Sequence, residues 1–257
     1  MLMGPQNLPE RIDQVRNRIE KAALQAGRRV DSITLLGVTK GQPAAAIRAA
    51  REAGLTDFGE SYLQEALEKI AALTGPAVAQ GARTDPGAAE IAAVHHLTWH
   101  FIGRLQANKT RPVAESFAWV HAVDRLKIAE RLAEQRPYYA PPLNVCLQVN
   151  VAGEASKGGV GFAELPALAA AVRALPRLKL RGLMCLPPQA DGQERQRPWF
   201  RKVREAFEEL NRTGLELDTL SMGMSGDLEA AIAEGATIVR VGTALFGPRP
   251  QRGTPGA

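Results

Sequence analysis

Short apolar runs alternate along the chain with segments in which apolar residues recur every three or four positions. The apolar runs predict strands at residues 33–40, 57–60, 99–103, 119–123, 143–151, 178–186, 219–222 and 237–241. The segments between them predict helices at residues 43–54, 62–73, 108–115, 126–135, 164–175, 198–212 and 227–234, with a further helix at 8–27 before the first strand. Strict alternation of strand and helix predicts a parallel sheet covered by helices.

Eight predicted strands favour a closed barrel over an open doubly wound sheet, which usually has fewer strands. A (β/α)8 barrel needs about 250 residues, and this chain has 257. We therefore expect an α/β fold, a single (β/α)8 TIM-like barrel domain over residues 1–257 with an additional N-terminal helix. The Ala/Gly-rich stretch 74–96 has weak periodicity and is interpreted as a surface insert, and residues 248–257 as a flexible tail.

Composition and charge exclude several classes of protein. No apolar run approaches the roughly 20 residues of a membrane span, and the first residues lack the apolar core of a signal peptide. The net charge is +5, but acidic residues are interleaved with basic ones, which argues against a nucleic-acid partner. Cys146 and Cys185 lie inside apolar runs without metal-ligand spacing. We expect a cytoplasmic protein with buried thiols, without metal, membrane or nucleic-acid partners.

Two turns rich in Gly, Ser and Thr follow the last two predicted strands. Ser225 and Gly226 precede the helix that starts at Asp227, and Gly242 and Thr243 follow the final strand. Loops after strands 7 and 8 of such barrels frequently bind phosphate, through backbone N–H groups at helix N-termini and Gly-rich turns. The alternative is that Ser225 or Asp227 only caps the helix. Two such turns after adjacent strands favour a phosphate site.

Three lysines are expected near the carboxyl ends of the strands, Lys40, Lys109 and Lys157. Barrel closure places the first strand beside the last, and neighbouring strands are about 4.8 Å apart, so only Lys40 lies within one strand of the phosphate turns. A lysine beside a phosphate site suggests pyridoxal 5′-phosphate held as a Schiff base on Lys40, whose amine must be neutral to attack an aldehyde. A cofactor-free Schiff-base aldolase also uses a strand-end lysine and stays an alternative.

Arg240 interrupts the apolar run of the last strand, where an unpaired guanidinium would be costly. One hypothesis is a structural ion pair with a neighbouring acid. The other is a hydrogen bond to the pyridine nitrogen, which would stay unprotonated because arginine keeps its proton, so the ring would be a weak electron sink. His100 and His121 are interpreted as polar residues of the barrel interior. Glu60, at the end of its strand, either faces the barrel mouth or forms a salt bridge.

Several segments together carry a resemblance to a known family. They are Leu36–Lys40, Phe58–Glu60, Trp99–Gly103 with Leu105–Lys109, Arg181–Met184, and Leu220–Ser225 through Val239–Gly247. In this order, over most of the chain, they resemble the pyridoxal phosphate homeostasis protein family, which is related to the barrel domain of alanine racemase. The resemblance implies a cofactor site made of Lys40, Ser61, Ser221, Met222, Ser225, Arg240, Gly242 and Thr243.

The resemblance also implies a role for each group. Lys40 would form the Schiff base and Arg240 would contact the pyridine nitrogen. Ser225, Gly242 and Thr243 would hold the phosphate, with Ser221 and Met222 beside the ring. The family commonly has Asn where this chain has Ser61, and the shorter hydroxyl puts a contact to the phenolic oxygen in doubt. The stretch 74–96 looks longer than the family typically has.

The family's usual role is to bind and buffer pyridoxal phosphate, affecting vitamin B6 and amino-acid balance, without established turnover. The resemblance implies a carrier and not an efficient enzyme. We expect a monomer, with pyridoxal-phosphate-dependent apoenzymes as recipients of the cofactor. The alternative is a racemase-like enzyme, which needs a second proton carrier on the opposite face of the ring. In alanine racemase this is a tyrosine from a partner's additional domain. Here Tyr138 and Tyr139 fall at the wrong end of the barrel, and only Tyr62 is on the correct rim.

Overall fold

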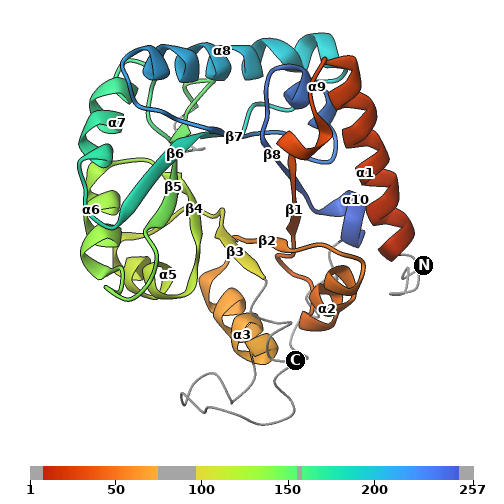
Figure 1. Ribbon diagram of the computed structural model, residues 1–257, viewed down its shortest axis with the longest axis horizontal. Coiled ribbons are helices and arrows are strands. Elements are labelled where there is room, and N and C mark those ends of the chain that lie inside the picture. The colour runs from red at the N-terminus through yellow and green to blue at the C-terminus, as the bar shows by residue number, and fades with distance from the viewer. Residues whose placement is uncertain (1–7, 75–96, 155–157, 249–257) are drawn as a thin grey trace, which may run out of the picture.

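Eight parallel strands form a closed barrel in chain order in the computed structural model, which describes residues 8–74, 97–154 and 158–248. The strands are β1 (Thr34–Val38), β2 (Asp57–Glu60), β3 (Thr98–Phe101), β4 (Trp119–Val123), β5 (Leu143–Val149), β6 (Leu178–Cys185), β7 (Thr219–Ser221) and β8 (Ile238–Val241). Figure 1 looks into the barrel and shows the helices as a ring around the strands. The (β/α)8 barrel predicted from the alternation of apolar runs and helices is therefore confirmed.

The helices follow the predicted positions closely. They are α1 (Leu8–Gln25), α2 (Ala44–Glu52), α3 (Leu63–Thr74), α5 (Thr110–Ser116), α6 (Leu126–Gln135), α7 (Leu165–Arg173), α8 (Gln193–Arg212), α9 (Leu228–Ala233) and α10 (Thr243–Phe246). None of the helices within the described ranges is long and apolar enough to cross a membrane. Apart from Thr74 and Pro248, the predicted insert 74–96 and the predicted tail 248–257 lie outside the described residues.

Two helices differ from the prediction. Helix α8 begins at Gln193, five residues before the predicted start at 198, because Gly192 has a φ of 80° and turns the chain directly ahead of it. Helix α10 was not predicted, since its four residues are too few to show a helical repeat. Its first residue is Thr243, so the second predicted phosphate turn leads directly into a helix.

Pairing of β1 with β8 closes the barrel and sets the geometry of one end of it. Leu36 lies opposite Arg240, and Gly37 lies opposite Val241. Because the two strands run parallel, Lys40 and Gly242 leave the barrel at the same carboxyl end, from neighbouring strands. The sequence-based prediction that the first and last strands are adjacent is confirmed.

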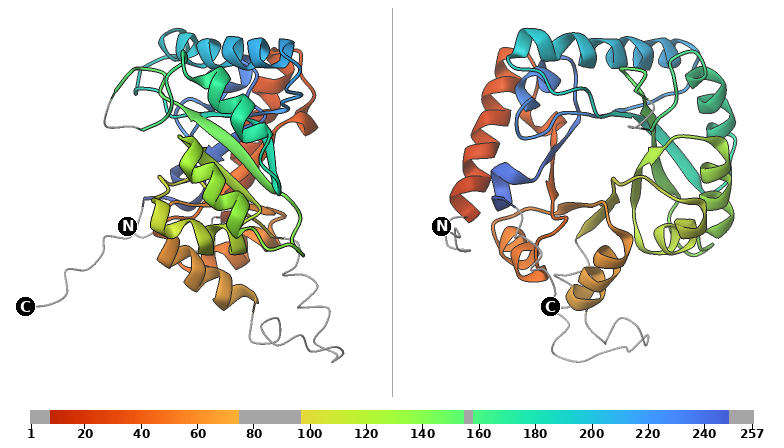
Figure 2. Two further views of the ribbon diagram at one scale, coloured as in Figure 1. Left: turned by 90° about the vertical axis from the view of Figure 1, so that its left-hand side faces the viewer. Right: turned by 180° about the vertical axis from the view of Figure 1, so that it is seen from behind.

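The extra N-terminal helix α1 packs beside α9 and α10, as both views in Figures 1 and 2 show. Its apolar face buries Ile12, Val15 and Ile19. These positions are three or four residues apart, which places them on one side of the helix. The predicted helix before the first strand is thereby confirmed, and it covers the last two β–α units of the barrel.

Strand residues alternate between an apolar outer layer and a partly polar interior. Phe58, Val145 and Val239 belong to the large core that packs against the helices. Inside the barrel lie His100 and His121, which are 1% and 0% exposed. Buried imidazoles need hydrogen-bond partners, and each of these has two. The interpretation of both histidines as polar residues of the barrel interior is confirmed.

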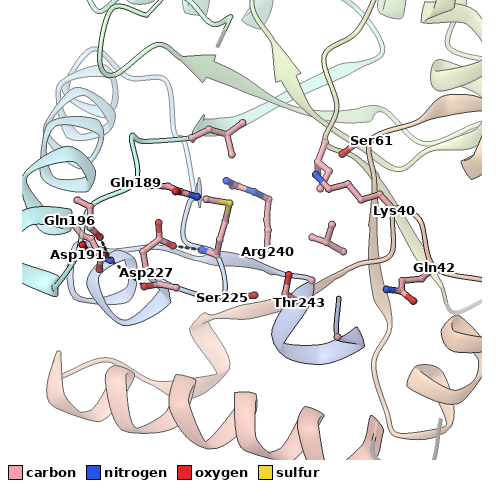
Figure 3. A pocket seen from close by; sticks show the side chains of 18 of the residues that line it. Lys40, Gln42, Ser61, Gln189, Asp191, Gln196, Ser225, Asp227, Arg240 and Thr243 are labelled. Atoms are coloured by element: carbon pink, nitrogen blue, oxygen red, sulfur yellow. Dashed lines mark hydrogen bonds between the residues drawn. The ribbon is translucent and has the colours of Figure 1, made fainter. Parts of the chain in front are cut away.

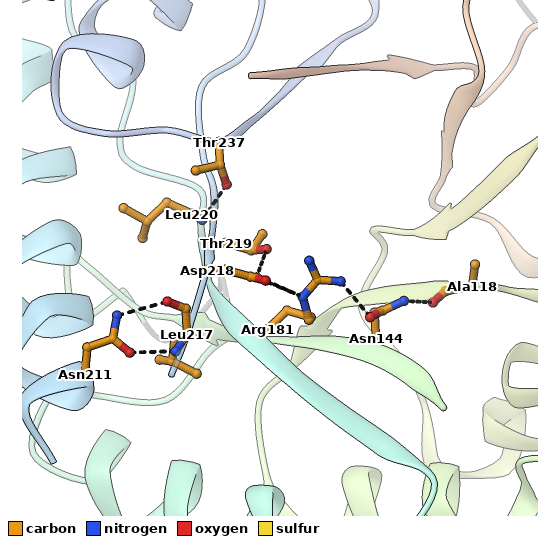
Figure 4. Close-up of polar contacts among 9 residues, drawn as sticks. All are labelled: Ala118, Asn144, Arg181, Asn211, Leu217, Asp218, Thr219, Leu220 and Thr237. Carbon is orange, nitrogen blue, oxygen red and sulfur yellow. Dashed lines mark hydrogen bonds and ion pairs between the residues drawn. The ribbon is translucent and has the colours of Figure 1, made fainter. Parts of the chain in front are cut away.

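A network around Arg181 closes the amino-terminal end of the barrel (Figure 4). The Nε of Arg181 donates to both carboxylate oxygens of Asp218, at 2.8 and 3.0 Å, and Nη1 donates to Oδ1 of Asn144 at 2.9 Å. Asn144 in turn donates to the carbonyl of Ala118 at 3.2 Å, and the guanidinium lies 4.6 Å over the ring of Trp119. The motif that begins at Arg181 therefore ties β4, β5, β6 and β7 together at the end opposite Lys40.

Candidate functional site

A cavity of about 610 Å³ opens at the carboxyl end of the barrel. Its volume falls in the range of about 300–1,000 Å³ that is usual for small-molecule sites. The polar side chains around it come from the ends of β1, β2 and β8, from the turn after β7, from the connection between β6 and α8, and from the first turn of α8. They are Lys40, Gln42, Ser61, Gln189, Asp191, Gln196, Ser225, Asp227, Arg240 and Thr243, and Gly242 also lines the cavity.

Lys40 and Arg240 extend into this cavity from neighbouring strands (Figure 3). Ser61 lies beside Lys40 in that view, whereas Ser225 and Thr243 lie together at another edge. The structure thus brings a lysine amine, a guanidinium and the two Gly/Ser/Thr turns around one space. Such a set can bind a small molecule that carries a carbonyl group, a hydrogen-bond acceptor and an anionic group.

The main chain before Lys40 is held by a buried ion-pair cluster behind the barrel wall. The ammonium of Lys69, on α3, donates to the carbonyl of Thr39 at 2.6 Å, to Glu60 Oε1 at 2.7 Å and to Glu65 Oε1 at 2.6 Å. The Thr39 hydroxyl donates to the same Glu60 oxygen at 2.6 Å. Glu60 therefore points toward α3 and not into the barrel mouth, and the salt-bridge alternative is confirmed.

The Glu60 carboxylate is fully buried in this cluster. Burial raises the pKa of Glu60, although the hydrogen bonds from Lys69 and Thr39 favour the ionised form. Its Oε2 accepts no hydrogen bond from the residues that the structure describes. Sequence reasoning missed Lys69. The sequence does contain a sign of its role. Lys69 is three residues after Ala66 and four before Leu73, which places it on the same, buried side of the helix.

The turn after β7 depends on a glycine. Gly223 has a φ of 95°, a conformation that residues with a Cβ rarely adopt, and a Cβ there would lie 2.6 Å from the Cβ of Ala231. The carbonyl of Gly223 accepts the backbone N–H of Arg240 at 2.9 Å. This bond fixes the turn that carries Ser225 against the strand that carries Arg240.

The two predicted phosphate turns are linked to each other. The Ser225 hydroxyl accepts the backbone N–H of Ala244, in the first turn of α10, at 3.3 Å. Asp227 accepts the backbone N–H of Met224, so its side chain orders the preceding turn. Asp227 is the N-cap residue of α9 but makes no side-chain hydrogen bond to that helix, so the capping alternative is wrong for this residue. Burial raises the pKa of Asp227, against the lowering effect of the Met224 hydrogen bond and of the nearby Arg240 charge. In α10, the N–H groups of Leu245 and Phe246 donate to the carbonyl of Gly242, at 3.0 and 2.9 Å. Gly242 and Thr243, at the start of this helix, line the cavity beside Ser225, which makes this edge suited to an anion.

The guanidinium of Arg240 is buried among neutral acceptors. Nη1 donates to the carbonyl oxygen of Ser221 at 2.5 Å and to its hydroxyl at 2.7 Å, and Nη2 donates to the carbonyl of Cys185 at 2.8 Å. Burial lowers the pKa of Arg240, which is 4% exposed. Within the described ranges no carboxylate lies at ion-pair distance from it, so the ion-pair hypothesis is wrong for this part of the chain. These three bonds use three of the five N–H donors of the group.

Two of the predicted cofactor residues, Ser221 and Met222, do not line the cavity. Ser221 is fully buried beneath Arg240, and Met222 is fully buried in the apolar core under the helices. Met224 reaches the cavity instead. Successive residues of an extended segment point to opposite sides, which separates Ser221 from Met222.

The other lysine that the structure describes near this rim lines a different cavity. Lys109 lies with Tyr62, Arg104 and Arg125 around a space of about 1070 Å³, and Ser61 borders both cavities. Only Lys40 among the described lysines lines the cavity with the phosphate turns. Lys157 lies outside the described residues. No group of three or more His, Cys, Asp or Glu in the described segments is arranged to hold a metal ion.

Comparison with known proteins places this barrel in a family. The family described as "Alanine racemase, N-terminal domain" matches residues 11–250. The pyridoxal phosphate homeostasis protein of Pseudomonas aeruginosa is 56% identical over 242 residues, covering 94% of this chain and 96% of the relative. That of Escherichia coli K12 is 47% identical over 243 residues, covering 95% and 97%.

A solved structure agrees with these relatives. PipY of Synechococcus elongatus with pyridoxal phosphate bound is 35% identical to this chain, has a TM-score of 0.70, and the match covers 90% of this chain and all of PipY. The chain therefore belongs to the alanine racemase N-terminal domain family and, within it, to the pyridoxal phosphate homeostasis proteins.

Proposed function

We propose that this protein binds pyridoxal 5′-phosphate as a Schiff base on Lys40 and acts as a cytoplasmic carrier or buffer of the cofactor, without efficient catalysis. The observation that carries the proposal is that Lys40, Arg240 and the two phosphate turns line one cavity of about 610 Å³. The names of the relatives and the pyridoxal phosphate in the PipY structure support it.

The cavity fits this cofactor group by group. Lys40 provides the amine for the aldehyde, and Ser225, Gly242 and Thr243 provide hydrogen-bond donors for the phosphate. Arg240 has N–H donors left for the pyridine nitrogen. Bound pyridoxal phosphate supplies an electrophilic carbonyl and a ring that can withdraw electrons. Because arginine keeps its proton, it cannot protonate the ring nitrogen, and strong carbanion stabilisation is not favoured.

Three further residues contribute indirectly in this proposal. Ser61 borders the cavity beside Lys40, where its hydroxyl would be available to a polar substituent of the ring. Ser221 acts by holding the guanidinium of Arg240. Met222 acts by packing the turn after β7 into the core.

Absorption and covalent trapping test the proposal. The purified protein should be yellow with pyridoxal phosphate, and Lys40→Ala should abolish the Schiff-base absorption, even where the phosphate still binds. Lys109→Ala is the matched control, because Lys109 lines the other cavity, and it should keep the absorption. Borohydride reduction and peptide mass mapping should place the adduct on Lys40. An adduct on Lys109 or Lys157 would overturn the assignment, and a colourless protein that takes up no cofactor would favour the aldolase alternative.

The relation to alanine racemase raises a racemase-like enzyme as the second candidate. Within the described part of the chain, no tyrosine lines the Lys40 cavity, and Tyr62 lines the neighbouring one. Tyr138 and Tyr139 are 90% and 79% exposed in the connection between α6 and β5. We therefore expect no appreciable D-alanine after incubation with L-alanine. Turnover comparable to that of dedicated racemases would refute the carrier proposal.

The carrier proposal includes a monomeric protein and apoenzymes as recipients. Mixing the loaded protein with a pyridoxal-phosphate-dependent apoenzyme, in the presence of a scavenger of free cofactor, should restore the activity of the apoenzyme. Restoration that the scavenger blocks completely would show release into solution and not direct transfer.

A further inference from the structure

A continuous chain of hydrogen bonds runs through the barrel interior from Arg240 to Asp57. Arg240 Nη1 lies 2.7 Å from Ser221 Oγ, and that oxygen lies 2.7 Å from His121 Nδ1. His121 Nε2 lies 2.9 Å from His100 Nδ1, and His100 Nε2 lies 3.0 Å from Asp57 Oδ1. The five residues come from five strands, and the three in the middle are at most 1% exposed. These hydrogen bonds thus connect the cavity with the other end of the barrel.

The far end of this chain is a carboxylate near solvent. Asp57 is the first residue of β2, at the amino-terminal end of the barrel, and its side chain is 23% exposed. Burial raises the pKa of Asp57, but the hydrogen bonds with His100 and Thr56 outweigh it and leave the pKa below its ordinary value. An ionised Asp57 can only accept hydrogen bonds.

Both imidazoles are neutral links in the chain. Burial lowers the pKa of His100, against the raising effect of Asp57. Burial also lowers the pKa of His121 well below 6.5, and the neighbouring His100 and the positive charge of Arg240 act in the same direction. A neutral imidazole has one N–H donor and one acceptor nitrogen, so the state of one end of the ring determines the other.

The ionised carboxylate therefore sets the direction of every bond. His100 must carry its hydrogen on Nε2 to donate to Asp57, which leaves Nδ1 as an acceptor for His121 Nε2–H. The Nδ1 of His121 is then an acceptor, and the Ser221 hydroxyl donates to it. The lone pairs of Ser221 are left facing Arg240, which donates to them.

We propose that Asp57, His100, His121 and Ser221 are positioning residues that orient the Arg240 guanidinium from the opposite end of the barrel. If the direction of the hydrogen bonds were reversed, both histidines would carry their ring hydrogen on Nδ1. The buried Ser221 hydroxyl would then lose its acceptor, which is unfavourable. The fixed direction keeps Ser221 an acceptor for Arg240, so that the remaining guanidinium N–H donors keep one orientation. That these donors serve a pyridine nitrogen rests on the proposed function.

The ring of Trp119 packs against this chain of hydrogen bonds. The Trp119 ring stacks on His100 with centroids 5.4 Å apart and planes at 9°. Arg181 lies on Trp119 and pairs with Asp218, a second carboxylate at the same end of the barrel. Hydrogen bonds with Arg181 and Thr219 help hold the pKa of Asp218 low against burial, but Asp218 makes no bond to either histidine. It is therefore a matched control for the charge of Asp57.

The test compares Asp57→Asn with Asp218→Asn in the full-length protein. Nitrogen-15 NMR of the ring nitrogens should show His100 and His121 as Nε2–H tautomers in the unaltered protein. Asn can either donate or accept, so Asp57→Asn should add the Nδ1–H tautomer of both rings and weaken pyridoxal phosphate binding roughly three- to tenfold. Asp218→Asn removes the same charge but should leave the tautomers and the affinity unchanged.

A second variant keeps the test decisive if Asp57→Asn does not fold. Ser221→Ala removes the last link, and it should weaken cofactor binding while His100 keeps its Nε2–H tautomer. Nδ1–H tautomers in the unaltered protein, or equal effects of Asp57→Asn and Asp218→Asn, would overturn the inference. If the unaltered protein takes up no cofactor on Lys40, the proposed function fails. The tautomer measurement still decides, independently of the cofactor, whether the hydrogen bonds from Arg240 to Asp57 all run in one direction.

Discussion

Lys69 donates a buried hydrogen bond of 2.6 Å to the carbonyl oxygen of Thr39, the residue directly before Lys40. The same ammonium pairs with Glu60 at the end of β2. A cation on α3 thus joins the carboxyl ends of the first two strands from outside the barrel. The main-chain position of Lys40 is set by this cluster, which itself does not line the cavity.

Replacing the cation should destabilise the protein strongly. Lys69→Met leaves Glu60 buried without its partner, and breaking a buried ion pair in this way costs about 3–5 kcal/mol. The free energy of unfolding in urea measures the loss. Lys127→Met, on the surface of α6, is the control and should change stability by less than about 0.5 kcal/mol. A loss below about 1 kcal/mol for Lys69→Met would contradict the structural importance of the cluster.

Glu60 should give stability a specific pH dependence. Because its pKa in the folded protein is raised above the ordinary 4.5, the folded state binds more protons than the unfolded state between the two values. Its contribution to stability is present below the ordinary value and is lost as the pH rises through the raised one. Glu60→Gln should lack this decline, as urea unfolding at several pH values would show. Parallel curves for both proteins would contradict the prediction.

Arg18 should support the phosphate turn from the N-terminal helix. Its guanidinium donates to both oxygens of Glu229, at 2.7 and 2.9 Å, and to the carbonyl of Ser225 at 3.0 Å. Arg18→Lys keeps the charge but loses the paired geometry, so it should weaken pyridoxal phosphate binding several-fold. Arg16→Ala removes a contact of the same helix to Gly54, away from the cavity, and should leave the affinity unchanged. Equal affinities of both variants would contradict the role of Arg18.

The two interior histidines should make the protein less stable in acid. Their pKa values are lowered below the ordinary 6.5 by burial, so the unfolded state binds more protons than the folded state once the pH falls below that value. Their contribution is present above about pH 6.5 and is lost as the pH falls through the lowered values. His121→Asn should lose less stability between about pH 7 and about pH 5 than the unaltered protein. Urea unfolding at both pH values measures the difference.

Both cysteines should be inert in the folded protein. Burial raises the pKa of Cys146 and of Cys185 to about 12, and neither thiol is exposed. The thiolate is the reactive form, so Ellman's reagent should label neither residue until the protein unfolds. Denatured protein, in which both thiols should react, is the control. Rapid labelling of the native protein would contradict their burial.

The repeat of apolar runs was enough to predict the barrel, and its closure was enough to predict which lysine lies beside the phosphate turns. Eight strands in strict alternation with helices leave few topologies, and a closed barrel makes the first and last strands neighbours. Lys40 could therefore be separated from Lys109 without coordinates. Helix α10 could not be predicted, because four residues are too short for a periodic pattern.

Side-chain direction within the strands was decided only by the tertiary structure. The sequence marked Arg240 and both histidines as polar groups in apolar strands, but it did not show that they share one hydrogen-bond chain with Ser221. The sequence also did not show that the Glu60 side chain points away from the barrel mouth and pairs with Lys69. Strand positions fix the order of residues along the barrel, whereas register, bulges and the turn at each strand end determine which side chains meet across it. Contacts between residues a hundred positions apart arise only when the barrel closes.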